Sequence, residues 1–321
     1  MRQSSLLCFL AFLLFACADR DSTALPQATG AVNSLSVVIP DQLWDGEIGD
    51  SIRKKFAAPV DGLPQEEPQF TINQYPLRAL DGRLTARNVL IIKKEDRSEY
   101  KMVRNEFAEP QHVAHISGKS IPDIITVLDE HVNGIVSQFK ANEIAYSQRK
   151  IDTSKLETEL LKKRFKIDLL ISNKYKVALS KRNFIWFKRE ILSGNTSLVV
   201  YRVPTSAIFK GGNVAGNIIR VRDSISRKYI RGKERGSKMQ TEESYAPYFA
   251  VGRLNGRRIY ETKGTWELKG DFMNGSFINF AIRDKKRNQF VIVEGFCYAP
   301  STEKRDLMHE LEAMIKSVKL Y

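Results

Sequence analysis

Short apolar runs and helical stripes alternate through the first half of the chain. Ile48, Ile52 and Phe56 stand four residues apart, which predicts a short helix that Asp45 could cap. A longer stripe follows Ser120, with Pro122 in the first turn, and predicts a helix reaching about Arg149. Three apolar runs predict buried strands: Leu35–Ile39, Asn88–Lys93 and Gln111–Ser117.

The second half is richer in strands. A helix is expected over residues 214–229, and a last helix opens after Pro300 with Leu311 on its buried face. Asn255-Gly256 and Asn274-Gly275 favour the type I′ turns of hairpins, so we place a hairpin turn at each. Another turn at residues 285–288 precedes the last long strand. The predicted strands are Ile167–Ile171, Tyr175–Leu179, Phe184–Arg189, Ser197–Val203, Phe249–Leu254, Arg257–Trp266, Ser276–Arg283 and Gln289–Tyr298.

These elements predict an α+β protein with two α/β sandwich-like domains. The N-terminal domain spans residues 34–150 and ends in the long helix. The C-terminal domain spans residues 151–321 and combines a mainly antiparallel sheet with a closing C-terminal helix. The chain has 321 residues and a hydrophobic fraction of 42%, which suits a folded globule of this size.

The N-terminus has the form of a cleaved signal. Leu6–Phe15 is apolar but far shorter than the roughly 20 residues of a membrane span. The sequence Leu14-Phe15-Ala16-Cys17 resembles a lipoprotein signal, which implies a signal peptide at 1–16 and a lipid on Cys17. A plain secretory signal with an incidental cysteine is the alternative. Residues 17–33 then form a flexible tether.

The expected location is the cell envelope. Ala18 follows the anchor where aspartate would favour the inner membrane, so we expect the outer membrane, with the periplasmic or surface face left open. Besides Cys8 and Cys17, only Cys297 occurs, so the mature chain is expected to hold no internal disulfide. Cys297 lies in an apolar strand and is expected to be a buried, inert thiol.

The formal net charge is +14, and it is densest over residues 227–238. Arg231, Lys233 and Arg235 are candidate binding residues there, although such a run is most often a solvated loop. In the envelope the expected partners are the membrane itself, through the lipid on Cys17, and envelope proteins or anionic envelope polymers rather than nucleic acid.

Motifs for cofactors, metals and catalysis are largely missing. Gly118-Lys119-Ser120 lacks the earlier glycine of a phosphate-binding loop, since position 113 is valine. His112 and His115 are three apart on a predicted strand and therefore point to opposite faces. We expect no metal and no cofactor, and we name no catalytic residue.

The segment DQLWDGEIGD gathers acids, a tryptophan and glycines between a strand and a helix. Its candidate binding residues are Asp41, Trp44, Asp45 and Asp50. The alternative is an ordinary helix start with a tryptophan packed on the core. The sequence favours a non-enzymatic binding or scaffolding protein. The rival hypothesis is an envelope hydrolase that uses these acids, or the Glu261 and Glu267 carboxylates on one strand.

Three stretches carry a resemblance to a known family: VVIPDQLWDGEIGDSIR, KYKVALSKRNFIWFKRE, and a late block that includes GTWELKGDFMNGSFINF and FVIVEGFCYAPSTEKRDLMHELEAMIKSV. With the lipoprotein signal, they resemble a Bacteroidota lipoprotein family classed as a domain of unknown function, DUF4837. The resemblance implies compartment and lineage but assigns no activity. The second half also loosely resembles the PsbP-like fold, which implies an antiparallel sheet closed by a helix.

Overall fold

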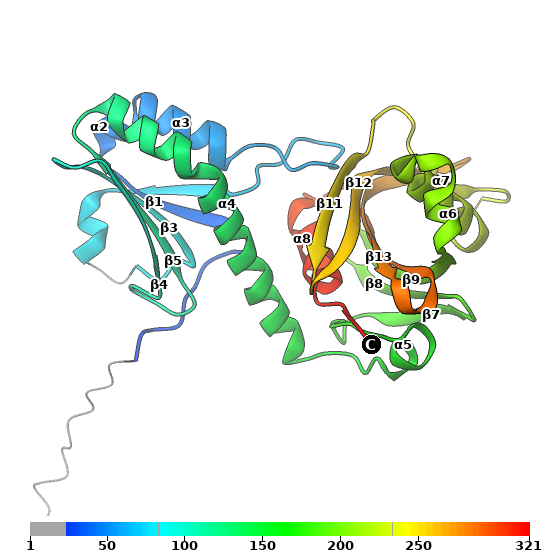
Figure 1. The fold of residues 1–321 in the computed structure, drawn as a ribbon. Coiled ribbons are helices and arrows are strands. Elements are labelled where there is room, and N and C mark those ends of the chain that lie inside the picture. Colours follow the sequence, from blue (N-terminus) through cyan, green and yellow to red (C-terminus); the bar gives the residue numbers. More distant parts are fainter. Residues whose placement is uncertain (1–23, 82–83, 233) are drawn as a thin grey trace, which may run out of the picture.

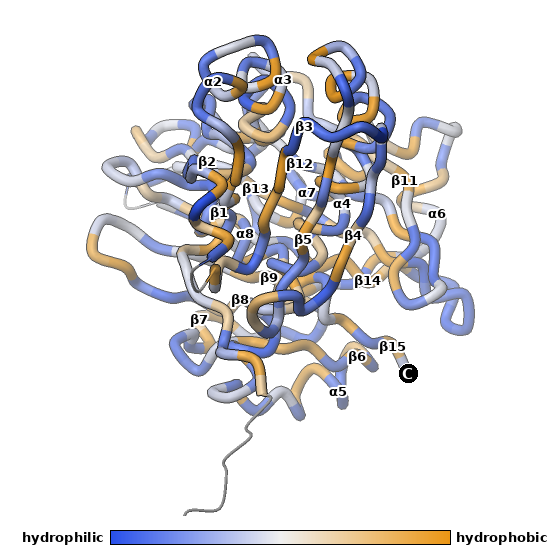
Figure 2. Tube along the Cα trace, turned by 90° about the vertical axis from the view of Figure 1, so that its left-hand side faces the viewer, coloured by the Kyte–Doolittle hydropathy of each residue, from blue (hydrophilic) through white to orange (hydrophobic). Residues whose placement is uncertain are grey.

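The computed structural model describes residues 24–81, 84–232 and 234–321, and it is an α+β fold (Figure 1). The signal peptide, Cys17 and the first part of the predicted tether lie outside the described residues. Figure 2 shows hydrophobic stretches along several strands; β13 and β14 are buried over most of their length because both faces of their sheet are covered. Among the described helices, none has the length and apolar character that crossing a membrane would require.

The N-terminal sheet has the strand order β2-β1-β3-β5-β4, in which only β4 runs antiparallel to its neighbour. Helices α3 and α4 cover one face through a core that includes Phe56, Phe70 and Phe139. Its strands are β1 (Ser34–Val38), β2 (Thr71–Tyr75), β3 (Asn88–Lys94), β4 (Glu99–Arg104) and β5 (His112–Gly118). Its helices are α2 (Asp41–Trp44), α3 (Glu47–Phe56), the short 3₁₀ helix η2 (Leu77–Asp81) and α4 (Ile121–Asp152).

The C-terminal sheet is antiparallel, in the order β10-β12-β13-β14-β9-β8-β7, and β11 also pairs with β12. One face packs on α5 and α8, and the other on α6 and α7. Its main strands are β7 (Lys176–Lys181), β8 (Phe184–Ile191), β9 (Gly194–Pro204), β10 (Lys238–Thr241), β11 (Tyr248–Leu254), β12 (Arg257–Lys269), β13 (Asn274–Asp284) and β14 (Gln289–Tyr298). Its helices are α5 (Glu159–Phe165), α6 (Thr205–Phe209), η3 (Lys210–Gly212), α7 (Val214–Tyr229), η4 (Lys285–Arg287) and α8 (Arg305–Lys316), and the short strands β6 (Ile167–Asp168) and β15 (Lys319–Leu320) pair with each other.

The predicted fold class is therefore confirmed, and so are most of the strongly patterned elements. The long helix begins after Ser120, whose hydroxyl caps the Asp123 N–H while the Asp123 carboxylate accepts from the Ser120 N–H. The helix at 214–229 and the strand at 289–298 have the predicted bounds. Asn255 and Gly256 take φ values of 49° and 74°, as a type I′ hairpin turn requires.

Several local predictions were wrong. Asn274 and Gly275 lie inside β13, paired with β12, and not in a turn. A Cβ on Gly275 would lie 1.9 Å from the Cys297 carbonyl oxygen, so the glycine permits a close backbone approach rather than a turn. Strands β2 and β4 had no distinct apolar pattern because their side chains are mostly exposed or half-buried. The last helix begins at Arg305, later than Pro300 suggested.

The described part of the predicted tether is also a correction, because it is built into the fold. The N–H groups of Ala28 and Thr29 donate to the carbonyls of Glu109 and Thr85, and Ala28 is buried. The guanidinium of Arg87 donates to carbonyl oxygens of residues 29, 30 and 31. The segment is ordered by hydrogen bonds to the buried Arg87, which is far away in the sequence. The small polar residues of the segment itself therefore gave no indication of this structure.

Candidate functional site: a pocket between the two domains

Helix α8 of the C-terminal domain is anchored by a carboxylate from the N-terminal domain. The buried Glu67 lies in the connection between α3 and β2, which reaches toward the C-terminal domain (Figure 1). Its carboxylate accepts hydrogen bonds from the N–H groups of Lys304, at 2.8 and 3.0 Å, and of Arg305, at 2.7 Å. A negative charge at a helix N-terminus is favoured by the helix dipole and satisfies N–H groups that the helix leaves unbonded.

Helix α4 contacts α8 along the same junction. His309 Nε2 lies 3.0 Å from Ser147 Oγ, and Gln148 Nε2 donates to the Ala313 carbonyl at 2.9 Å. Asn33 at the start of the N-terminal domain donates to Asp306 at 2.9 Å. Each of these bonds joins a residue before 153 to one on α8, so α8 is the surface on which the two domains meet.

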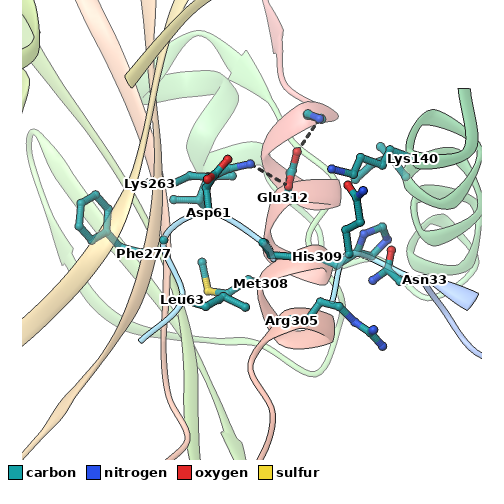
Figure 3. A pocket seen from close by; sticks show the side chains of 16 residues that line it. Asn33, Asp61, Leu63, Lys140, Lys263, Phe277, Arg305, Met308, His309 and Glu312 are labelled. Carbon is teal, nitrogen blue, oxygen red and sulfur yellow. Dashed lines mark ion pairs between the residues drawn. The ribbon is translucent and has the colours of Figure 1, made fainter. Parts of the chain in front are cut away.

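A pocket of about 110 Å³ opens beside this junction (Figure 3). Its walls come from α4, α8, β12, β13 and the connection between α3 and β2. The apolar part includes Leu63, Phe277 and Met308. The charged and polar part consists of Asn33, Asp61, Gln69, Lys140, Lys263, Arg305, His309, Glu312 and Lys316.

Glu312 is the charged centre of the pocket. Its carboxylate lies 3.6 Å from Lys263 Nζ and 2.5 Å from Lys316 Nζ. Burial alone would raise the pKa of this carboxyl, but Lys263 and Lys316 outweigh burial and hold the pKa at about 2. Glu312 is therefore ionised throughout the physiological range and is already paired by two lysines.

Lys263 is paired on both sides. Burial lowers the pKa of its amine, while Glu312 and Glu261 raise it, and the net pKa lies above the ordinary value. The Glu261 carboxylate is 2.9 Å from Lys263 Nζ. Lys263 therefore stays charged and forms ion pairs with both Glu261 and Glu312.

Lys140 differs from the other two lysines of the pocket. Figure 3 shows it extending from α4 toward Glu312, yet within the described residues its amine forms no ion pair or hydrogen bond. Its side chain keeps contact with solvent, while partial burial and then repulsion from Lys263 lower the pKa of the amine. The acidic side chains of Glu312 and Asp61 partly offset this lowering, but neither forms an ion pair with Lys140 among the described residues, so its amine is accessible to a ligand.

His309 completes the polar wall. Burial lowers the pKa of its imidazole below 6.5, and the nearby Glu312 and Glu143 only partly offset this. The ring is therefore neutral at pH 7 and is held by Ser147 at the domain junction. It contributes a hydrogen-bonding surface rather than a further charge.

The acidic segment at 41–50 forms two consecutive helical elements, and the binding role predicted for it stays a prediction. It folds into α2 and the start of α3, and Asp45 ends α2 rather than capping α3, whose first turn follows Gly46. Arg53 lies 4.5 Å from the centre of the Trp44 ring and pairs with Asp50 at 2.7 Å. Asp41 instead accepts from Gln74 at 2.9 Å. Asp41 and Asp50 therefore have different partners and are not drawn together by a shared one.

The basic segment at 227–238 is an exposed surface. Arg231 and Arg235 are exposed, and Lys233 lies outside the described residues. Arg231 lines a shallow depression with the end of α7, where Arg227 lies 4.0 Å from Asp223. The binding role predicted for this segment stays a prediction.

The remaining candidates are kept apart by the fold. Glu261 and Glu267 are six residues apart on β12, which places them about 20 Å from each other. A glycosidase pair needs about 5 to 9.5 Å, so these carboxylates do not form one. His115 pairs with Glu106 at 2.7 Å, and no group of three metal-ligating side chains gathers in the described ranges. Burial raises the pKa of the Cys297 thiol to about 11, as an inert thiol requires.

Sequence reasoning missed the pocket. Glu312 and Lys316 stand four apart on a helix, which signals an ion pair but not a site. Lys140 and Lys263 are 123 positions apart in the chain. Lys140 lies on α4 and Lys263 on β12, so they reach one pocket only because the two domains pack together where α8 contacts α4.

Comparison with known proteins gives family but not activity. Residues 28–152 match a family described as Domain of unknown function (DUF8532), and residues 154–317 match Domain of unknown function (DUF4837). No curated protein matches the chain. The boundary predicted between residues 150 and 151 stays a prediction.

Two solved structures show limited similarity. The Saccharomyces cerevisiae Ran-binding protein Mog1p is 10% identical, with a TM-score of 0.33, over 48% of this chain and 90% of that chain. Human StAR-related lipid transfer protein 5 is 12% identical, with a TM-score of 0.24, over 54% of this chain and 97% of that chain. Such scores carry no argument about this protein. The DUF4837 match spans more than half of the chain, and the chain belongs to that family of unknown function.

Proposed function

We propose that this protein is a non-enzymatic, lipid-anchored binding protein of the cell envelope whose interdomain pocket binds a small organic anion. The anchor is the lipid expected on Cys17, and the outer membrane is the proposed location. Envelope proteins or anionic envelope polymers are the proposed partners of its basic surface.

The observation that carries the proposal is the exposed amine of Lys140, which lines the pocket and forms no ion pair or hydrogen bond among the described residues. Glu312 is shared by Lys263 and Lys316, so it is a poor counter-ion for a third lysine. The exposed Asp61 also lines the pocket but forms no ion pair with Lys140 among the described residues. A carboxylate from a ligand would give the Lys140 amine a charge-assisted hydrogen bond.

The apolar wall and the volume of the pocket determine the chemistry and the size of the rest of the ligand. Leu63 is half-buried and Ile278 is buried in the same apolar cluster as Met308, and together they offer a surface for a short carbon chain. Pockets for drug-sized ligands measure about 300 to 1,000 Å³, and this cavity measures about 110 Å³. The ligand is therefore a carboxylic acid of few carbons rather than a long lipid.

The position of the pocket supports a binding role. Lys140 belongs to the N-terminal domain, and Lys263 and Met308 to the C-terminal domain, so one ligand would contact both. The hydrogen bonds that the Glu67 carboxylate accepts, and the one between Ser147 and His309, already fix α8 in place. A pocket held in its binding geometry before the ligand arrives loses less entropy on binding.

The hydrolase hypothesis gains no support from the same pocket. Glu312 has a pKa of about 2 and is paired with two lysines, which makes it a weak general base and no general acid at neutral pH. Of the acids proposed for that chemistry, Asp41, Asp50, Glu261 and Glu267 each contact a neighbouring side chain. We therefore retain the binding hypothesis.

The test is calorimetric titration with straight-chain carboxylates from acetate to octanoate, each compared with the alcohol of equal length. We expect binding of carboxylates only, with affinity rising with chain length until the cavity is filled. Lys140→Met is expected to weaken binding at least tenfold, and Lys150→Met, at an exposed position of the same helix, to leave it unchanged. Equal affinities for acid and alcohol, or for the two variants, would refute the proposal.

The anchor has its own test. Cys17→Ala is expected to move the protein from the membrane fraction to the soluble fraction of cells that express it. Metabolic labelling with a radioactive fatty acid should mark the wild-type protein but not the variant. A membrane-bound Cys17→Ala protein without label on the wild type would contradict the lipid anchor.

A further inference from the structure

A row of arginines crosses three neighbouring strands at one end of the C-terminal sheet. Arg253 on β11 pairs directly with Arg258 on β12. Ile259 pairs with Ile282, so the next position along brings Arg258 beside Arg283 on β13. We name Arg253, Arg258 and Arg283 the arginine row. Like charges directly opposite each other destabilise an antiparallel sheet, so this arrangement has a cost in folding.

The row lines a concave surface that contains no acid. The depression measures about 460 Å³, and its lining is Arg253, Gly256, Arg257, Arg258, Arg283 and Lys285. The five cations form no ion pair with any described residue. The acid next to Arg283 in the sequence, Asp284, is buried and pairs with Arg287 of η4.

The few contacts these side chains make leave their charge unbalanced. Arg253 and Arg257 each donate to a backbone carbonyl, at 3.4 Å in both cases. The Arg283 guanidinium lies 5.1 Å from the centre of the Phe209 ring, and its buried Nε has no hydrogen-bond partner. An unsatisfied buried donor on a cation is a costly group that an anion beside it would satisfy.

The backbone holds the row in a fixed shape. The turn between β11 and β12 is a tight Asn-Gly turn, and Asn255 Nδ2 donates to the Val318 carbonyl at 2.8 Å, which ties the turn to the C-terminal segment. Adjacent strands lie about 4.8 Å apart, so the backbone positions of the three arginines are closely and regularly spaced. The planar guanidinium group of an arginine can donate two parallel hydrogen bonds to two oxygens of one phosphate group.

We propose that the arginine row is a second binding site, distinct from the interdomain pocket, and that it takes a ligand with one or two phosphate groups. The phosphate belongs either to a soluble phosphate ester or to the headgroup of an anionic lipid. The chemistry of recognition is the same in both cases. The arginine row and the interdomain pocket share no lining residue.

The experiment measures two probes on the full chain. Calorimetry with inorganic pyrophosphate tests a soluble ligand, and co-sedimentation with vesicles of phosphatidylglycerol in phosphatidylcholine tests a headgroup. The test variant is Arg253→Gln with Arg258→Gln. The control removes two positive charges from exposed sites elsewhere, Lys174→Gln with Arg182→Gln. Thermal unfolding of each variant is recorded alongside.

We expect the test variant to bind at least one probe tenfold more weakly than the wild type, and the control to change binding less than twofold. The test variant should unfold at the same or a higher temperature, because it removes the repulsion between paired arginines. Pyrophosphate binding alone supports the soluble source, and vesicle binding alone supports the headgroup. Equal effects of the two variants, or no binding of either probe by the wild type, would overturn the proposal.

Discussion

The charge of Glu312 makes a measurable contribution to stability. Its carboxyl has an ordinary pKa of 4.5 and a folded pKa of about 2, because Lys263 and Lys316 stabilise the ionised form more than burial destabilises it. One pKa unit corresponds to about 1.4 kcal/mol, so the ionised carboxylate contributes about 3 kcal/mol at neutral pH. Glu312→Gln removes that charge and leaves the shape of the side chain.

The sign of the pH dependence follows from the lowered pKa. The contribution is complete above pH 4.5 and is lost as the pH falls toward 2, because the unfolded state then binds the proton first. At pH 3, about 1 kcal/mol remains. The difference in stability between wild type and Glu312→Gln is therefore expected to shrink from about 3 kcal/mol at pH 7 to about 1 kcal/mol at pH 3.

Urea denaturation of both proteins at pH 7, 5, 4 and 3 measures this difference. Glu303→Gln, at an exposed position just before α8, serves as the control and should change stability by less than about 0.5 kcal/mol at any pH. A difference for Glu312→Gln that stays constant with pH, or that is below 1 kcal/mol at pH 7, would show that the two lysines do not stabilise this carboxylate as described.

Three further predictions concern the domain junction and the sheet. Glu67→Gln is expected to lower the free energy of unfolding by about 1 to 3 kcal/mol in urea, because it weakens charge-assisted bonds to the start of α8, whereas Glu66→Gln should have little effect. His309→Gln should reduce the loss of stability between pH 7.5 and 5.5, because the buried imidazole has a lowered pKa and the unfolded chain takes up the proton; an unchanged pH profile would argue against this. Gly275→Ala should lower the melting temperature strongly, since its Cβ would meet the Cys297 carbonyl; a wild-type melting curve would contradict that geometry.

Elements with a clear hydrophobic periodicity or a clear turn motif could be predicted from the sequence, because the residues that determine them are close together in the chain. The capping box at Ser120 and the stripe behind it define α4 within the chain itself. The Asn255-Gly256 turn requires only two residues with positive φ. The turn predicted at Asn274-Gly275 was wrong because the same residue pair also occurs in a strand, where glycine allows two backbones to approach closely.

The candidate site could not be predicted because its residues meet only through tertiary packing. Buried ion pairs give the same lesson: Arg87 and Glu143 are 56 positions apart, and Arg222 and Glu294 are 72 apart. No local pattern marks such partners. The acidic segment at 41–50, by contrast, was conspicuous in sequence; it forms α2 and the start of α3, and its binding role stays a prediction.

A crystal structure of the protein soaked with the carboxylate that binds best in the titration tests the central claim most directly. The claim predicts the carboxylate at about 3 Å from Lys140 Nζ, with its carbon chain against Leu63 and Met308. A pocket without ligand density under saturating conditions, or a carboxylate bound elsewhere with Lys140 untouched, would contradict it.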